Sequence, residues 1–195
     1  MNRRAVLLPL LLAGCGLSER PYAERRQWPL MLARPGAMPA RPGGKVLEVR
    51  SLRAGPGLEA RGLQSLAADG SIATEFYEEW SVPPAQAVEE ALRGWLGASG
   101  LYGAVLTPGS RVAADWVIEG DLGALWTEPG ANLAHAALGI TLVAVQATEP
   151  RVVLQRRYRE TAAFAPATPA AAVQAMVAAL TLVLARLESD LRRLG

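Results

Sequence analysis

The chain has 195 residues, a formal net charge of +2 and a sequence pI of about 9.0, with Lys45 as its single lysine. No stripe of Lys and Arg interleaved with aromatic residues accompanies this basic pI, so a nucleic-acid partner is not expected. A single cysteine, Cys15, excludes a disulfide within the chain. The length is sufficient for one sizeable hydrophobic core.

The first residues carry the pattern of an export signal. Arg3 and Arg4 form a positive end, and the apolar residues 5–13 that follow are fewer than the roughly 20 that a transmembrane helix needs. The lipobox consists of Leu12, Ala13, Gly14 and Cys15. We therefore expect a signal peptide over residues 1–14, cleaved before Cys15, whose thiol receives diacylglycerol and whose new amino group receives an acyl chain such as palmitate. The alternative is a buried free cysteine.

Residues 15–44 are predicted to form a lipidated tether. Proline and glycine recur through this segment, which leaves little room for a helix or a strand. We favour a loosely ordered, extended linker, and the alternative is that Tyr22 to Leu32, which includes Trp28, docks on the domain or on a partner. The folded domain is then expected to span residues 45–195.

The first part of this domain is predicted to consist of strands. Alternating residues indicate a strand over 45–53, and two further segments, 61–67 and 72–80, flank Asp69-Gly70. An Asp-Gly pair between alternating segments is typical of a tight hairpin turn. In the second segment of this hairpin, Ile72, Phe76 and Trp80 are expected to share one face.

A helix is predicted to begin after Pro83-Pro84. Its apolar stripe consists of Val88, Leu92, Trp95 and Leu96. Glu89 and Arg93 lie one turn apart on the polar side, and Gly97 is a stop signal. A short apolar strand over 101–106 follows.

The clearest alternation of the chain runs over 114–126 and predicts a strand with one buried face. The expected buried set is Ala114, Trp116, Ile118, Leu122, Ala124 and Trp126. Gly120 and Gly123 are predicted to bend this strand. Short turns lead into strands over 132–147 and 151–164, so we expect a three-stranded antiparallel meander.

The last element is predicted to be a long helix with Thr168 as its N-cap and Pro169 in its first turn. Its heptad-like apolar positions are Val173, Val177, Leu180, Leu184, Leu187, Leu191 and Leu194. We favour a helix that lies on the sheet, with packing on a neighbouring subunit left open. Gln174 and Arg186 interrupt the apolar run and disfavour a membrane span. The expected fold class is α/β (α+β), a mostly antiparallel sheet with two main helices packed on it.

Residues with catalytic chemistry are few. His135 is the single histidine and lies in an apolar strand, and no serine stands in a Gly-x-Ser-x-Gly motif, so we interpret His135 as a strand residue facing the sheet surface or the core. Asp115, Glu119 and Asp121 share one strand face, where carboxylates can bind a hard cation or form an acid/base pair. We favour the solvated face of an amphipathic strand instead, and expect neither catalysis nor a metal site.

Several motifs occur in a characteristic order between about Val46 and Leu191. They are Arg61-Gly62-Leu63, Tyr77-Glu78-Glu79-Trp80 before Pro83-Pro84, and Asp115-Trp116-Val117-Ile118-Glu119-Gly120, together with the lipobox and the closing helix. In this the chain resembles the ABC-type transport auxiliary lipoproteins, the group that includes the lipoprotein of the paraquat-inducible membrane-integrity operon. The resemblance implies a periplasmic α/β domain with two helices against a mostly antiparallel sheet, and no enzymatic activity.

The resemblance also implies the partners, namely an ABC permease with its ATPase and an MCE-domain protein that conducts lipid between membranes. We accordingly expect a non-catalytic periplasmic lipoprotein subunit of a lipid transport system, which supports phospholipid trafficking and membrane integrity and needs no cofactor beyond the lipids on Cys15. One alternative is a stand-alone periplasmic lipoprotein that binds lipid or a small molecule in a pocket between helices and sheet. Another is an envelope hydrolase that uses the carboxylates of the 114–126 strand.

The location and the contact surface complete the expectations. Gly16 stands where an inner-membrane retention signal would place an aspartate, which favours the outer membrane over the inner. Tyr77, Trp80 and Tyr102 are the predicted partner contacts, with a place in the core as the alternative for each and as the favoured interpretation for Trp80. A homo-oligomer formed through the last helix is left open.

Overall fold

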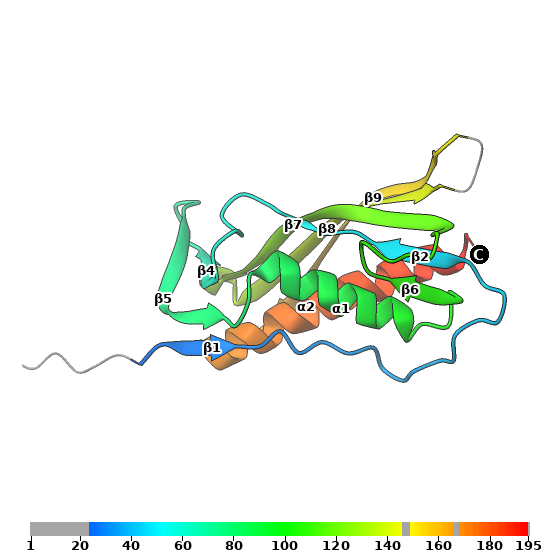
Figure 1. Cartoon of the computed structure of the whole chain (residues 1–195). Coiled ribbons are helices and arrows are strands. Elements are labelled where there is room, and N and C mark those ends of the chain that lie inside the picture. Colours follow the sequence, from blue (N-terminus) through cyan, green and yellow to red (C-terminus); the bar gives the residue numbers. More distant parts are fainter. Residues whose placement is uncertain (1–23, 146–148, 166–167, 195) are drawn as a thin grey trace, which may run out of the picture.

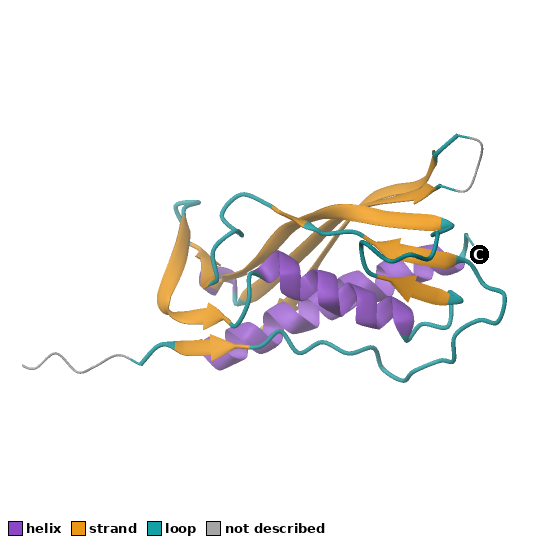
Figure 2. Cartoon of the chain, viewed as in Figure 1, coloured by secondary structure: helices purple, strands orange, loops and turns teal. Residues whose placement is uncertain are grey.

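The computed structural model describes residues 24–145, 149–165 and 168–194. The predicted signal peptide, Cys15 and the rest of the lipobox lie outside the described residues and stay predictions. The elements are, in order, β1 (Arg26–Trp28), β2 (Val46–Val49), β3 (Arg53–Ala54), β4 (Gly62–Leu66), β5 (Ile72–Trp80), α1 (Pro84–Gly97), β6 (Ala104–Leu106), β7 (Trp116–Glu128), the 3-10 turn Pro129–Ala131, β8 (Leu133–Ala144), β9 (Arg151–Ala163) and α2 (Pro169–Arg192). Both helices lie on one face of the sheet (Figures 1 and 2).

The strands form one nine-stranded mixed sheet. Its order is β1-β5-β4-β7-β2-β6, with β3 also paired to β7 and with β8 between β7 and β9. The long pairings β4–β5, β7–β8 and β8–β9 are antiparallel, which confirms the predicted hairpin and meander. The pairings of β1 with β5 and of β2 with β6 and β7 are parallel, because long crossovers separate these strands in sequence. The α+β fold class with two helices is confirmed.

The buried faces of the two helices form one side of the hydrophobic core, and the sheet forms the other. The predicted stripe of α1 is buried throughout, and the Glu89 carboxylate pairs with Arg93 at 3.2 Å. Helix α2 begins as predicted, since the Thr168 hydroxyl accepts a hydrogen bond from the amide of Ala171 at 3.3 Å. The predicted apolar positions of α2 are buried except Val177, which is partly covered, and Leu194, which is exposed.

Helix α2 is long and apolar enough to cross a membrane by length and composition alone, with a mean hydropathy of 1.9 over its most apolar stretch. In the fold it packs against β8 and β9 and carries the buried, charged side chain of Glu188. A core helix is the usual explanation for an apolar helix whose one face is packed on a sheet. The interpretation of α2 as a helix lying on the sheet is confirmed.

Strand β7 changes its buried face at a bulge. Its register with β8 shifts between Leu122 and Ala124, at Gly123, whereas the register continues unbroken through Gly120, the other glycine predicted to bend the strand. A bulge inserts one residue and so exchanges the two faces beyond it. Leu125 is therefore fully buried, whereas Trp126 is only partly buried and lines a hollow with His135. The prediction that Trp126 continues the buried face is wrong for this reason.

The strap, which we define as residues 24–44, is packed along the domain (Figure 1). Its β1 pairs with β5, and Trp28, Leu30 and Leu32 pack against the hydrophobic core. Further along, the amide of Met38 donates to the carbonyl of Ala98 at 2.9 Å. The favoured prediction of a loosely ordered linker is wrong for these residues, and the docking alternative holds. Alternate apolar side chains give this extended segment one face to bury.

Candidate functional site

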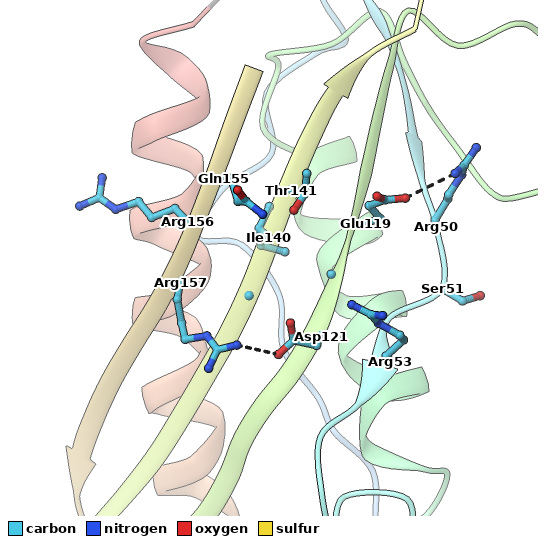
Figure 3. Close-up of a pocket in the computed structure, with 12 residues that line it drawn as sticks. Arg50, Ser51, Arg53, Glu119, Asp121, Ile140, Thr141, Gln155, Arg156 and Arg157 are labelled. Atoms are coloured by element: carbon cyan, nitrogen blue, oxygen red, sulfur yellow. Dashed lines mark hydrogen bonds and ion pairs between the residues drawn. The ribbon is translucent and has the colours of Figure 1, made fainter. Parts of the chain in front are cut away.

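The face of the sheet opposite the helices carries a charged groove, shown in Figure 3. It has a volume of about 570 Å³. Strands β7, β8 and β9 form its floor and one wall, and residues 50–53 form the other wall. The polar and charged lining residues are Arg50, Ser51, Arg53, Glu119, Asp121, Thr141, Gln155, Arg156 and Arg157.

Two glycines on neighbouring strands allow close packing in the floor of the groove. Gly120 of β7 is paired with Ile140, and a Cβ added there would collide with the carbonyl oxygen of Gly139. A Cβ at Gly139 would come within 2.5 Å of an Asp121 carboxylate oxygen. Glycine is the residue that permits such close approaches of backbone and side chain. The groove therefore depends on the pairing of β7 with β8 in this register.

The carboxylates of the groove are engaged by arginines. Glu119 pairs with Arg50 at 3.4 Å, and Asp121 pairs with Arg157 at 3.5 Å. Arg53 has no ion pair among the described residues, and Figure 3 shows it beside Asp121. Arg156 points toward α2 and pairs with Asp190 at 2.8 Å, so three arginines face two carboxylates and the groove has an excess of one positive charge. That excess suits an acidic segment or another anionic group.

The three carboxylates predicted to share a strand face differ in their contacts. Glu119 and Asp121 lie in the groove, whereas the Asp115 carboxylate accepts a hydrogen bond from the amide of Val46 at 2.7 Å and so ties the start of β2 to β7. Within the described ranges, no group of three or more His, Cys, Asp or Glu side chains is placed to hold a metal ion. The expectation that the protein lacks catalysis and a metal stays a prediction.

His135 lies beside the bulge of β7. Its Nε2 is 3.0 Å from a carboxylate oxygen of Glu128, and both residues are partly exposed. A hollow of about 390 Å³ borders His135, Trp126 and Arg159. His135 is therefore a strand residue at the sheet surface, which is one of the two alternatives that the sequence left open.

Of the three predicted contact residues, only Tyr77 is exposed. Trp80 and Tyr102 are 1% and 5% exposed and belong to the hydrophobic core, so their side chains offer no surface to a partner. Burial also raises the pKa of the Tyr102 phenol above its ordinary value. Phe76, which was predicted to share a face with Ile72 and Trp80 but not to contact a partner, is 67% exposed beside Tyr77. The hairpin β4–β5 extends beyond the helices (Figure 1), and among the described residues Tyr77 and Arg25 contact the Phe76 ring.

A second group of charges joins the strap to both helices. The buried Glu188 carboxylate of α2 accepts hydrogen bonds from Arg34 Nε at 2.9 Å, from Trp95 Nε1 at 2.8 Å and from Arg192. Burial alone would raise the pKa of Glu188, but hydrogen bonds from Arg34, Arg192 and Trp95 hold it below its ordinary value. We call these four residues the Glu188 cluster. The sequence analysis missed it because its members are far apart in the chain.

Comparison with known proteins defines the fold. No family model matches the chain, and no curated protein matches it. Among solved structures, protein XCC0632 of Xanthomonas campestris, assigned to the family DUF330, has a TM-score of 0.68 at 19% identity, over 84% of this chain and 93% of that one. The dodecameric PelC of Paraburkholderia phytofirmans has a TM-score of 0.51 at 16% identity, over 81% and 95%.

A third similar structure is the protein CT253 of Chlamydia trachomatis, with a TM-score of 0.52 at 10% identity, over 76% of this chain and 98% of that one. At these identities the likeness is one of fold. Because each comparison covers nearly the whole of the other chain, the similarity extends to an entire domain and not to a shared motif. The chain thus has the fold of a DUF330 protein.

Proposed function

We propose that the protein is a lipid-anchored, non-catalytic subunit of an ABC/MCE-type lipid transport system, held at the periplasmic face of the outer membrane. Three features support the proposal: the predicted export signal that precedes Cys15, the motifs that resemble those of ABC-transport auxiliary lipoproteins, and the fold shared with a DUF330 protein. The engagement of Glu119 and Asp121 by arginines favours a binding role for these residues over acid/base chemistry.

The observation that carries the proposal is the contrast between the two faces of the sheet. The helices pack on one face, and in the part of the chain that the structure describes no element covers the groove on the other (Figure 2). A concave surface with excess positive charge is suited to hold an acidic segment of a partner, with charge contributing to orientation and selectivity. In this account the MCE-domain protein supplies that segment.

Charge reversal in the groove tests this docking surface. Arg53→Glu removes no ion pair among the described residues, so it should leave the fold intact while opposing an acidic partner. We expect recovery of the MCE-domain protein with the acylated chain in mild detergent to fall by about tenfold. Arg111→Glu makes the same charge change at an exposed loop position outside the groove and serves as the matched control. Equal recovery with both variants would contradict docking through the groove.

A stand-alone lipid-binding lipoprotein is the second candidate, and one cavity favours it. A hollow of about 440 Å³ at the C-terminal ends of the helices is bordered by Trp116, Tyr102 and Leu191. Arg41 and Lys45 add positive charge, Arg192 is paired with Glu188, and no carboxylate is among the described residues that line the hollow. This combination suits an amphiphile with an anionic head. Native mass spectrometry should find one lipid per chain if this candidate is right, and a lipid-free chain if it is wrong.

A further inference from the structure

Exposed apolar side chains gather at the end of the molecule where the strap begins. Ile72, Phe76 and Tyr77 of β5 are 43%, 67% and 47% exposed. The rings of Phe76 and Tyr77 meet edge to face at 5.0 Å, and the guanidinium carbon of Arg25 lies 4.9 Å from the centre of the Phe76 ring. We call these four residues the aromatic patch. Adjacent aromatic side chains in contact with one another at a surface indicate an interaction site more than isolated exposed residues do.

The aromatic patch lies beside the point where the chain departs toward Cys15. Strands β1 and β5 run parallel with Arg26 opposite Glu78. Arg25, one residue earlier, is therefore level with Tyr77. Residues 16–23 lie between Cys15 and the described strap, and a chain of that length spans at most roughly 30 Å when fully extended. An anchor on Cys15 would thus keep the β1–β5 end of the domain within roughly 30 Å of the bilayer surface, a range that includes direct contact of the patch with the headgroups.

The packing of the strap keeps this distance short. The indole Nε1 of Trp28 donates to the Glu78 carboxylate at 2.6 Å, and Arg34 is bound to buried Glu188 at 2.9 Å. These contacts hold β1 and the strap residues after it against the domain. The strap therefore does not lengthen the segment that connects the domain to Cys15. The β1–β5 end of the domain is therefore the end nearest to the anchor, and the β8–β9 hairpin lies at the other end (Figure 1).

We propose that the aromatic patch inserts into the headgroup layer of the leaflet that holds Cys15, so that the protein rests on the membrane with its β1–β5 end. The inference rests on the proposed lipidation. Tyrosine and phenylalanine place an apolar body into the interface, and arginine reaches the phosphate level through its apolar stem. Arg25 and Arg26 are offset by Glu24, Glu75 and Glu78 around the patch. Insertion consequently depends on burial of apolar surface and needs no anionic lipid.

A probe on the patch tests the proposal in the acylated, full-length mature protein. With Cys15 acylated, Phe76→Cys provides the only free thiol, which is labelled with a nitroxide in phosphatidylcholine vesicles. The matched control is Val152→Cys, an apolar position of β9 that is 57% exposed near the opposite end. We expect the probe at position 76 to be several-fold less accessible than the control to a water-soluble relaxation agent, and more accessible to dissolved oxygen. The difference should persist at high salt.

The outcomes separate this inference from the proposed function. Mass spectrometry that finds Cys15 unmodified would remove the anchor and the inference together. Acylated, vesicle-bound protein with equally accessible probes would overturn the inference alone. Shielding of position 76 only after addition of the MCE-domain protein would make the patch a protein interface and also overturn it. Hydrogen exchange of the unsubstituted protein guards against a misfolded variant, since amides of residues 72–78 should slow on vesicles while those of 151–156 do not.

Discussion

Two groups of arginines and carboxylates in this protein have the same chemistry and different surroundings. In the Glu188 cluster the carboxylate is buried and receives hydrogen bonds from three side chains. In the groove, Glu119 and Asp121 each pair with one arginine that is more than half exposed. A buried carboxylate that loses its partners is costly, whereas an exposed ion pair adds little to stability. The first group therefore holds the fold together, and the second is free to serve recognition.

The largest effect is expected from Glu188→Ala. The change removes the acceptor of the Trp95 indole N–H and leaves the Arg34 guanidinium only its bonds to backbone carbonyls, so the free energy of unfolding should fall by about 3 kcal/mol. Glu188→Gln keeps an acceptor oxygen and should lose less. Denaturation in urea measures both. A loss below about 0.5 kcal/mol in the alanine variant would show that the cluster does not fasten the strap.

Acidification should weaken the same cluster. The pKa of Glu188 is below its ordinary value in the folded protein, so folding binds fewer protons at this group. Its stabilising contribution is complete above the ordinary pKa of 4.5 and is lost as the pH falls through the lower, folded value. The Glu188→Gln variant should show a shallower loss of stability with acid over that range. Parallel pH profiles for the two proteins would contradict the assignment.

The smallest effect is expected in the groove. Glu119→Gln removes an exposed ion pair with Arg50, and the free energy of unfolding should change by no more than about 0.5 kcal/mol. The same urea measurement applies, with the wild-type protein as reference. If this variant were as unstable as Glu188→Ala, the groove would be a structural element and the comparison between the two groups would fail.

Local patterns in the sequence predicted the elements that depend on neighbouring residues. The Thr168 cap, the stripe of α1 and the Asp-Gly hairpin each rest on a few consecutive positions, and each is confirmed. The bend at Gly123 was predicted as well, but its consequence for Trp126 was not, because alternation assumes an unbroken phase.

Features that join distant segments were not predictable in this way. The groove needs Gly120 next to Gly139, and that depends on the register of β7 with β8. The Glu188 cluster needs Arg34 and Trp95 to meet α2 in the folded chain. In the sequence, Glu188 has the pattern of a residue at the polar edge of a helix. Its burial becomes evident only in the fold, where the strap packs against α2. Docking of the strap was only the alternative prediction, because the prolines and glycines of this segment favoured a loosely ordered linker.

The most direct test of the proposed function is affinity purification of the wild-type protein from its own membranes in mild detergent, followed by mass spectrometry of the chain and of what co-purifies. A lipid-anchored transport subunit predicts acyl chains on Cys15 together with recovery of an MCE-domain protein or its permease, and Cys15→Ala should lose the acyl chains and the membrane location. A solitary chain with an unmodified Cys15 would contradict the account.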